Sequence, residues 1–391
     1  MIQAGVPKRL VFAFGAVVVF LTILVLRHNS PHEVANARRR ASASLSALDD
    51  INNATLGFEK VFVVGLPSRT DRRDGMVLQA ALSNIDIDFI DGVKDSDIPE
   101  KAIPKAPENA HHIRGPALGS WRGHMNAIQQ IVRQNLSSAL VLEDDVDWDI
   151  RLRSQLRDFA LSTHALVQPL WAAPGHFADA TFPGRAEGAP STALELDYEQ
   201  LPPTVPPTTS PYGDGWDVLW IGHCGMHFPF EDGLVPKGRI IHREDVTVPK
   251  REHLWTLNIP FTLKDKYPEH TRAVHHVQEG VCSLGYAVSR AGARKILRHI
   301  ALREASDAFD ILLRFFCEGT RGRPHHICVT LQPALFHHHR PVGPNKEASD
   351  IGNHGDGFRT QAGTDMVRLS TRLNADILLS GGTTYIDQFP D

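Results

Sequence analysis

Residues 138–149 read SALVLEDDVDWD and place an apolar run directly before a group of five carboxylates. The run from Ala139 to Leu142 has no polar face, so it predicts a strand in the interior of a sheet that is covered on both sides. The carboxylates then lie at the carboxyl end of that strand, where open α/β sheets bind their ligands. They are Glu143, Asp144, Asp145, Asp147 and Asp149.

Carboxylates crowded this closely repel one another unless a cation or a set of donors neutralises them. Oxygen ligands suit Mg²⁺ or Mn²⁺, which commonly bridge to a substrate phosphate. We therefore predict a divalent metal site with Glu143, Asp145 and Asp147 as ligands. The alternative is an acidic helix N-terminus capped by Asp147 or Asp149, although capping needs one or two acids and not five.

The composition of the chain is that of a globular protein with many loops. Its 391 residues are 42% hydrophobic and include 26 prolines and 30 glycines. The net charge of -4 does not indicate the excess of basic residues that is typical of nucleic-acid-binding proteins, so we expect no nucleic-acid partner.

The chain has four cysteines and no Cys-x-x-Cys pair. They could form two disulfides, and their spacing leaves all three pairings open. The cysteines are Cys224, Cys282, Cys317 and Cys328.

The amino terminus predicts the compartment. Residues 10–26, LVFAFGAVVVFLTILVL, are uncharged and predict a transmembrane signal anchor. Basic residues precede the run, so residues 1–9 are expected to form a cytosolic tail and the rest of the chain to lie in the lumen. Sequons at Asn53 and Asn135 agree with this location. We expect a single-pass type II protein of the Golgi or ER membrane; a cleaved signal peptide is the alternative.

The rest of the chain divides by composition. Residues 27–58 lack sustained periodicity and predict a stem. We expect a catalytic domain over residues 59–345 and a C-terminal extension over residues 346–391. Residues 165–215 are rich in proline and predict an inserted, partly disordered surface excursion.

The predicted domain opens with a β-α-β unit. KVFVVGL at residues 60–66 is typical of a buried strand, an amphipathic helix starts at about residue 71, and IDIDFIDGV at residues 85–93 is the next strand. This order predicts an α/β fold with a mainly parallel sheet. A glycine-rich segment that becomes a helix, residues 115–135, leads into the opening stretch.

Six short motifs follow one another along the chain: VGLPSRTDR from Val64, GPALGSWRGHMNAI from Gly115, Glu143-Asp144-Asp145, and then WDVLWIG, LGYAVSRAGARKIL and DAFD. In this order they resemble glycosyltransferase family 25, which includes bacterial lipooligosaccharide galactosyltransferases and collagen galactosyltransferases. The family often has Asn where Gly65 stands, and its second motif frequently has Cys and Ser where Ser120 and Gly123 stand. The resemblance covers roughly residues 59–340, interrupted by the proline-rich insert.

The resemblance implies a GT-A-like, nucleotide-sugar-binding α/β sandwich and transfer with inversion at the anomeric carbon. UDP-galactose is the usual donor of the family, and a hydroxyl of a glycan or glycoprotein is the expected acceptor. Mn²⁺ or Mg²⁺ at the acidic motif would stabilise the charge that builds on the leaving diphosphate. The residues expected to bind the donor are Leu66, Arg69, Arg72, Gly119, His124 and Asp144.

An inverting transfer needs a general base that takes the proton from the acceptor hydroxyl. Asp310 is the first candidate, with Glu279 and Asp307 behind it. The cluster His337-His338-His339-Arg340 follows an apolar strand, and we expect His337 to approach the metal from the far side of the site. Two other functions stay open: a non-catalytic carbohydrate-binding relative, and a metal-dependent phosphohydrolase.

Overall fold

The computed structural model describes residues 47–104, 112–184, 194–352 and 354–391. The predicted cytosolic tail and signal anchor, residues 1–26, lie outside the described residues. Within the described ranges, every helix is too short or too polar to cross a bilayer.

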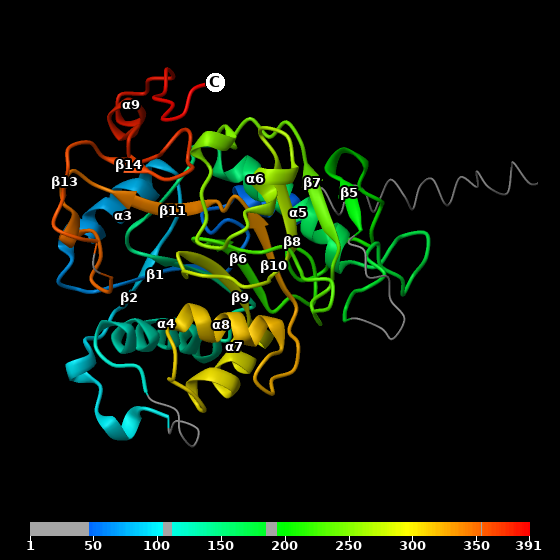
Figure 1. The fold of residues 1–391 in the computed structure, drawn as a ribbon, viewed down its shortest axis with the longest axis horizontal. Coiled ribbons are helices and arrows are strands. Elements are labelled where there is room, and N and C mark those ends of the chain that lie inside the picture. The colour runs from blue at the N-terminus through cyan, green and yellow to red at the C-terminus, as the bar shows by residue number, and fades with distance from the viewer. Residues whose placement is uncertain (1–46, 105–111, 185–193, 353) are drawn as a thin grey trace, which may run out of the picture. The chain divides into compact units, whose positions relative to one another are not determined.

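The core of the molecule is a sheet of nine strands in the order β2-β1-β3-β9-β6-β10-β8-β7-β5 (Figure 1). Seven strands run in one direction, and only β9 and β8 run against them. This confirms the predicted α/β class with a mainly parallel sheet, and it is consistent with a GT-A-like fold. The strands are β1 (Lys60–Gly65), β2 (Asp88–Asp91), β3 (Ser138–Glu143), β5 (Glu195–Asp197), β6 (Val218–Gly222), β7 (Arg239–His242), β8 (Arg272–His276), β9 (Gly285–Ser289) and β10 (Cys328–Gln332).

Strand β3 lies inside the sheet, parallel to β1 on one side and antiparallel to β9 on the other. Successive side chains of a strand point to opposite faces. Leu140 and Leu142 therefore join the core on one face, while Ala139 and Val141 join the core on the other. All four are at most 1% exposed, so the opening stretch does form an interior strand covered on both sides.

Helices cover both faces of the sheet (Figure 1). The face with Leu140 packs against α3 (Thr70–Leu82) and α5 (Leu152–Val167). The face with Val141 packs against α4 (Pro116–Arg133), α7 (Arg290–Ile296) and α8 (Phe309–Glu318). Two further α-helices in the described part of the chain are short: α6 (Thr262–Lys266) and α9 (Ala375–Leu379).

A small second sheet brings distant segments to the end of β3. Strand β11 (Phe336–Arg340) pairs antiparallel with β4 (Val146–Trp148) and with β14 (Gly363–Thr364). The histidine cluster therefore lies beside the acidic stretch. A further two-stranded ladder joins β12 (Gly343–Pro344) to β13 (Phe358–Arg359).

Three segments that the sequence placed outside the core pack against it. Leu48, Ile51 and Phe58 from the predicted stem are at most 3% exposed, and the compact unit begins at Leu48. In the insert, Tyr212 is fully buried and its hydroxyl donates to a backbone carbonyl at 2.7 Å. In the C-terminal extension, Asn374 is fully buried. These apolar and hydrogen-bonding side chains are scattered among polar residues, so no periodicity reveals them.

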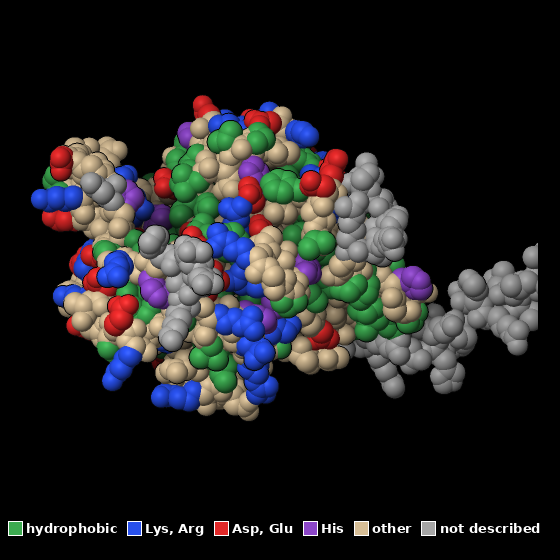
Figure 2. Space-filling model, turned by 60° about the horizontal axis from the view of Figure 1, so that its bottom comes forward, with side chains coloured by type: hydrophobic (Ala, Val, Ile, Leu, Met, Phe, Trp, Pro, Cys, Tyr) green, Lys and Arg blue, Asp and Glu red, His purple; other side chains and the backbone are tan. Residues whose placement is uncertain are grey.

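The side of the molecule that carries α4, α7 and α8 shows a stripe of Lys and Arg side chains (Figure 2). Helix α7, on this side, has exposed Arg294 and Lys295. Lys295 forms an ion pair with buried Asp217 at 2.7 Å. Part of this positive charge is therefore balanced within the fold.

Candidate functional site

A cavity of about 650 Å³ opens where β1 and β3 end. Both strands are parallel and end at the same edge of the sheet, which is where such sheets bind ligands. The wall also includes the first half of α4, the start of α8, the loop before β9, strand β11, the segment 92–96 after β2 and the segment 349–352. Eight of the residues proposed from sequence line it: Leu66, Arg72, Gly119, His124, Glu143, Asp144, Asp145 and Asp310.

One group in the cavity has the ligand atoms of a metal site. Glu143, Asp145 and His338 each offer an atom, and these atoms all lie within 4.8 Å of one another. The Oδ1 atom of Asp145 is buried and has no hydrogen-bond partner, which is costly for a carboxylate oxygen. Two carboxylates and one imidazole form a donor set that suits Mn²⁺. These residues therefore fit a divalent cation.

Arginines neutralise part of the acidic stretch without a metal. Arg72 Nη1 lies 2.7 Å from Asp144 Oδ1, and Arg72 Nη2 lies 3.5 Å from Asp145 Oδ2. Arg340 Nη1 is 3.3 Å from the same Asp145 oxygen. Burial raises the pKa of Asp144 to about 6, and the Arg72 charge opposes this shift. Asp144 therefore serves chiefly to hold Arg72 at the cavity wall.

Asp147, predicted as a metal ligand, lies away from the cavity. Its carboxylate is fully buried and accepts hydrogen bonds from the Gln79 amide at 2.8 Å, from the Thr364 hydroxyl at 2.6 Å and from the Ser370 hydroxyl. The donors that satisfy it come largely from the C-terminal segment, which sequence spacing does not connect to it. Asp149 lies three residues before α5 and accepts from the backbone N–H of Arg151 at 2.9 Å. Arg151 is the N-cap residue of α5 and makes no capping side-chain hydrogen bond, so the capping alternative is not confirmed.

His337, the histidine proposed as a ligand, also points away from the metal group. Side chains alternate along β11, so His338 and Arg340 line the cavity while His337 faces the other side. Its Nε2 lies 3.0 Å from the Ala334 carbonyl, and burial lowers its pKa to about 3. A run of three histidines contains no signal for which one faces the acids; the pairing of β11 with β4 decides it.

We expect His338→Ala to weaken Mn²⁺ binding by at least about tenfold, because it removes the imidazole of the metal group. His337→Ala is the matched control: it should leave Mn²⁺ affinity nearly unchanged and cost about 1–3 kcal/mol of stability, since it leaves a buried carbonyl unpaired. Calorimetric titration with Mn²⁺ in the presence of UDP, together with thermal unfolding, measures both. Equal losses of affinity in the two variants would contradict the assignment.

Asp310 is the carboxylate best placed to act as a base. It lies in the first turn of α8, and its two oxygens accept the backbone N–H groups of Cys282 at 2.8 Å and Ile311 at 2.9 Å. Burial raises its pKa, which suits a group that must take up a proton. Its orientation is therefore set by two backbone donors.

The two other base candidates do not line the cavity. Glu279 forms an ion pair with Arg314, and its backbone N–H donates to Glu318 at 2.5 Å. Asp307 pairs with the half-exposed Arg321 at 2.8 Å. Each carboxylate is therefore paired with an arginine outside the cavity.

His124 forms side-chain contacts rather than the backbone hydrogen bond that its position in a helix could suggest. Its Nδ1 is 2.9 Å from the Tyr286 hydroxyl, and its ring stacks on Phe309 with centroids 4.4 Å apart. Its Nε2 lies 3.3 Å from the Ser283 hydroxyl and 3.6 Å from Glu143. His124 thus lines the cavity and also supports a metal-group carboxylate.

Sequence reasoning missed Ser283, whose hydroxyl donates to Glu143 at 2.8 Å. A single serine in a loop carries no motif, so only the structure identifies it. Arg69, expected at the donor, does not line the cavity; it pairs with Asp71 at 2.8 Å and with Asp350 at 2.6 Å.

Two glycines allow close approach around the cavity. A Cβ at Gly65 would lie 2.2 Å from Asp144 Oδ2. The Asp144 carboxylate therefore occupies the space that a side chain at residue 65 would need. A Cβ at Gly119 would lie 2.3 Å from the Val93 carbonyl, so only glycine lets α4 approach that loop.

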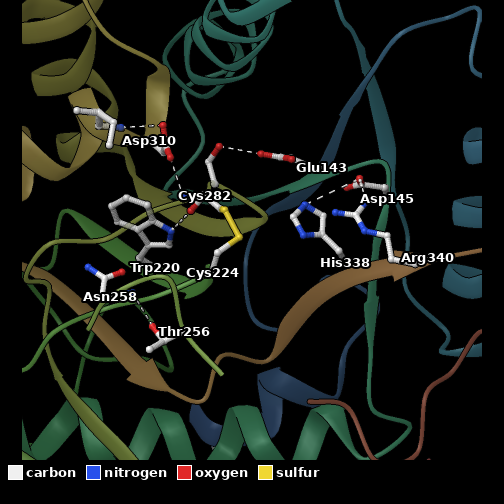
Figure 3. The surroundings of a disulfide bond; sticks show 12 residues. Glu143, Asp145, Trp220, Cys224, Thr256, Asn258, Cys282, Asp310, His338 and Arg340 are labelled. Carbon is white, nitrogen blue, oxygen red and sulfur yellow. Dashed lines mark hydrogen bonds and ion pairs between the residues drawn. A yellow bond between two sulfur atoms is a disulfide. The ribbon is translucent and has the colours of Figure 1, made fainter. Parts of the chain in front are cut away.

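All four cysteines are paired, as Cys224–Cys282 and Cys317–Cys328. The spacing had left three pairings open. Cys282 lines the cavity, and in Figure 3 it lies between Asp310 and Glu143.

Comparison with known proteins agrees with this geometry. Residues 58–172 match the family model described as glycosyltransferase family 25 (LPS biosynthesis protein), which confirms the resemblance seen in the motifs. Procollagen galactosyltransferase 1-B of Xenopus laevis is 29% identical over 121 residues, covering 27% of this chain and 20% of the relative. Inactive glycosyltransferase 25 family member 3 of Homo sapiens is 29% identical over 111 residues, covering 26% and 19%. The chain thus matches about a fifth of the length of these curated relatives.

Proposed function

Because residues 58–172 match glycosyltransferase family 25, we propose that this chain is a glycosyltransferase. It transfers a sugar, with galactose as the first choice, from a nucleoside-diphosphate donor to a hydroxyl of a glycan or glycoprotein. The transfer inverts the anomeric carbon. The name procollagen galactosyltransferase, carried by matched relatives from Xenopus laevis, supports this choice of donor and acceptor class.

One observation carries the proposal. The cavity holds a candidate metal group, Glu143, Asp145 and His338, and a separate oriented carboxylate, Asp310 (Figure 3). A transferase of this kind needs both parts: one stabilises the leaving diphosphate, and the other takes the acceptor proton.

The side chains of the cavity divide the work. Arg72 and Arg340 present guanidinium groups beside the metal group, where they can donate to diphosphate oxygens. A divalent cation held by Glu143, Asp145 and His338 would supply further positive charge against the leaving diphosphate. Asp310 accepts the proton of the acceptor hydroxyl as that oxygen attacks the sugar.

We further propose that the folded unit works in the lumen of the Golgi or ER, with residues 10–26 as a membrane anchor. The uncharged run supports the proposed anchor. The lumenal location is supported by the four cysteines, all of which are paired in disulfides that persist in oxidising compartments.

A donor screen tests the proposed activity. The folded unit, incubated with several nucleotide sugars and a glycopeptide acceptor mixture, should release UDP and label the acceptor most strongly with UDP-galactose. Omitting Mn²⁺ should lower the rate sharply, because the diphosphate then loses its charge partner.

Other outcomes identify the alternatives. Binding of UDP-sugar with neither transfer nor hydrolysis would indicate a non-catalytic relative, a possibility raised by the matched human protein whose name includes the word inactive. Release of inorganic phosphate from a sugar phosphate without a nucleotide would indicate a phosphohydrolase.

A further inference from the structure

We propose that the disulfide Cys224–Cys282 is a positioning element for the reaction. It fixes the two-residue segment Cys282–Ser283, which in turn holds the base Asp310 and the metal-group carboxylate Glu143 at a set spacing. The effect of the disulfide on catalysis rests on the proposed function. Its effect on the position of Cys282–Ser283 can be tested without measuring turnover.

The segment contacts both parts of the site with adjacent residues. The backbone N–H of Cys282 donates to Asp310 Oδ2 at 2.8 Å. The hydroxyl of the next residue, Ser283, donates to Glu143 Oε1 at 2.8 Å. Figure 3 shows Cys282 and its disulfide to Cys224 between Asp310 and Glu143. A shift of this segment therefore moves both carboxylates, or leaves both with a lost donor.

The backbone of Cys282 is held in a conformation that needs support. Its φ is 63°, a left-handed value that is uncommon for a residue other than glycine and persists only where the surroundings enforce it. The carbonyl of Cys282 accepts from the fully buried Trp220 indole at 3.0 Å. The disulfide to Cys224 supplies the covalent part of this support.

The other end of the disulfide is anchored in the central sheet. Cys224 follows β6 by two residues, and its N–H donates to the Val281 carbonyl at 2.9 Å. Its own carbonyl accepts from Leu257 N–H at 2.9 Å. The bond thus fastens the cavity loop to the end of an interior strand, across a sequence separation of 58 residues.

The second disulfide offers a matched control. Cys317–Cys328 joins the end of α8 to the start of β10, both its cysteines are buried, and neither lines the cavity. Its removal should affect stability without moving Cys282 or Ser283.

The experiment uses two variants, Cys224→Ala/Cys282→Ala and Cys317→Ala/Cys328→Ala. Steady-state transfer is measured for each well below its unfolding midpoint. We expect the first variant to lose at least about tenfold in kcat and to need a higher Mn²⁺ concentration for its half-maximal rate, because Asp310 and Glu143 both lose the segment that positions them and a 1 Å misplacement can cost about a hundredfold. The second should keep kcat within about twofold of wild type. Equal kcat in the two variants would overturn the proposal.

A reversible form of the test avoids folding without the bond. The Cys317→Ala/Cys328→Ala protein contains only the bond in question and is treated with dithiothreitol after folding. Two thiol groups of the reagent transfer two electrons and two protons, so Cys224 and Cys282 become thiols and the reagent closes to its cyclic disulfide. Activity should fall by at least about tenfold and return on reoxidation; unchanged activity with both thiols shown free by alkylation would refute the proposal.

Hydrogen–deuterium exchange separates this inference from the proposed activity. In the same protein, reduction should raise exchange in peptides covering residues 279–284 and 308–312 by at least about tenfold, whether or not any sugar is transferred. If exchange rises in this way but no sugar is transferred, the glycosyltransferase assignment is rejected and the positioning role of Cys224–Cys282 is kept. If exchange is unchanged on reduction, the positioning role is rejected, even in an active enzyme.

Discussion

Asp145→Asn should lower the turnover of sugar transfer by at least about a hundredfold while the protein remains folded. The substitution keeps the size of the side chain and removes the negative charge of the one acid in the stretch that has a buried, unpartnered oxygen. Mn²⁺ together with UDP should raise the unfolding midpoint of the wild type, and should do so much less in the variant, because a ligand stabilises only the state that binds it.

Asp147→Asn is the control for this prediction. The same chemical change is made two residues along the chain, at a carboxylate that is fully buried and hydrogen-bonded to Gln79, Thr364 and Ser370. It should cost about 1–3 kcal/mol of stability and leave Mn²⁺ affinity nearly unchanged.

The two variants distinguish a metal site from a purely structural role of the acidic stretch. If both variants lose stability and neither loses turnover selectively, the carboxylates act in folding alone. Full transfer activity of Asp145→Asn at limiting Mn²⁺ would rule out Asp145 as a ligand. Arg72 and Arg340, which both lie close to that carboxylate, would then be the charges expected to act on the diphosphate.

The sequence predicted the central sheet well, since β3 has a continuous apolar run that only an interior strand can use. It also placed Glu143 and Asp145 at the carboxyl end of that strand, where the cavity lies. These predictions depend on local pattern and on one general property of parallel sheets. Neither needs knowledge of distant contacts.

The structure differs from the sequence-based expectations where distant segments decide the environment of a side chain. Asp147 is satisfied by Thr364 and Ser370, which lie more than 200 positions further along the chain. Whether His337 or His338 faces the acidic residues depends on how β11 pairs with β4. The spacing of residues within the histidine cluster does not indicate this pairing. The packing of Leu48, Ile51 and Phe58, at the end of the predicted stem, also depends on segments that are distant in the sequence.

Asp310→Asn should lower kcat by about 10²- to 10⁴-fold, the range typical of losing a general base. The asparagine oxygen can still accept the Cys282 N–H, so the loop should keep its position. KM for the donor sugar should change little, because the metal group is made by other residues. Asp307→Asn, three residues earlier and outside the cavity, is the control and should retain kcat.

The pH profile gives this prediction a second readout. Burial raises the pKa of Asp310, with the nearby Glu143 charge adding to the shift, while the backbone donors and His124 oppose it. A base works in its ionised form, so wild-type activity should rise with pH through a midpoint above the usual range of aspartate. The residual activity of Asp310→Asn should lack that rise. If the variant kept the same acid limb, another group would be the base, and Asp310 would serve only to hold the Cys282 loop.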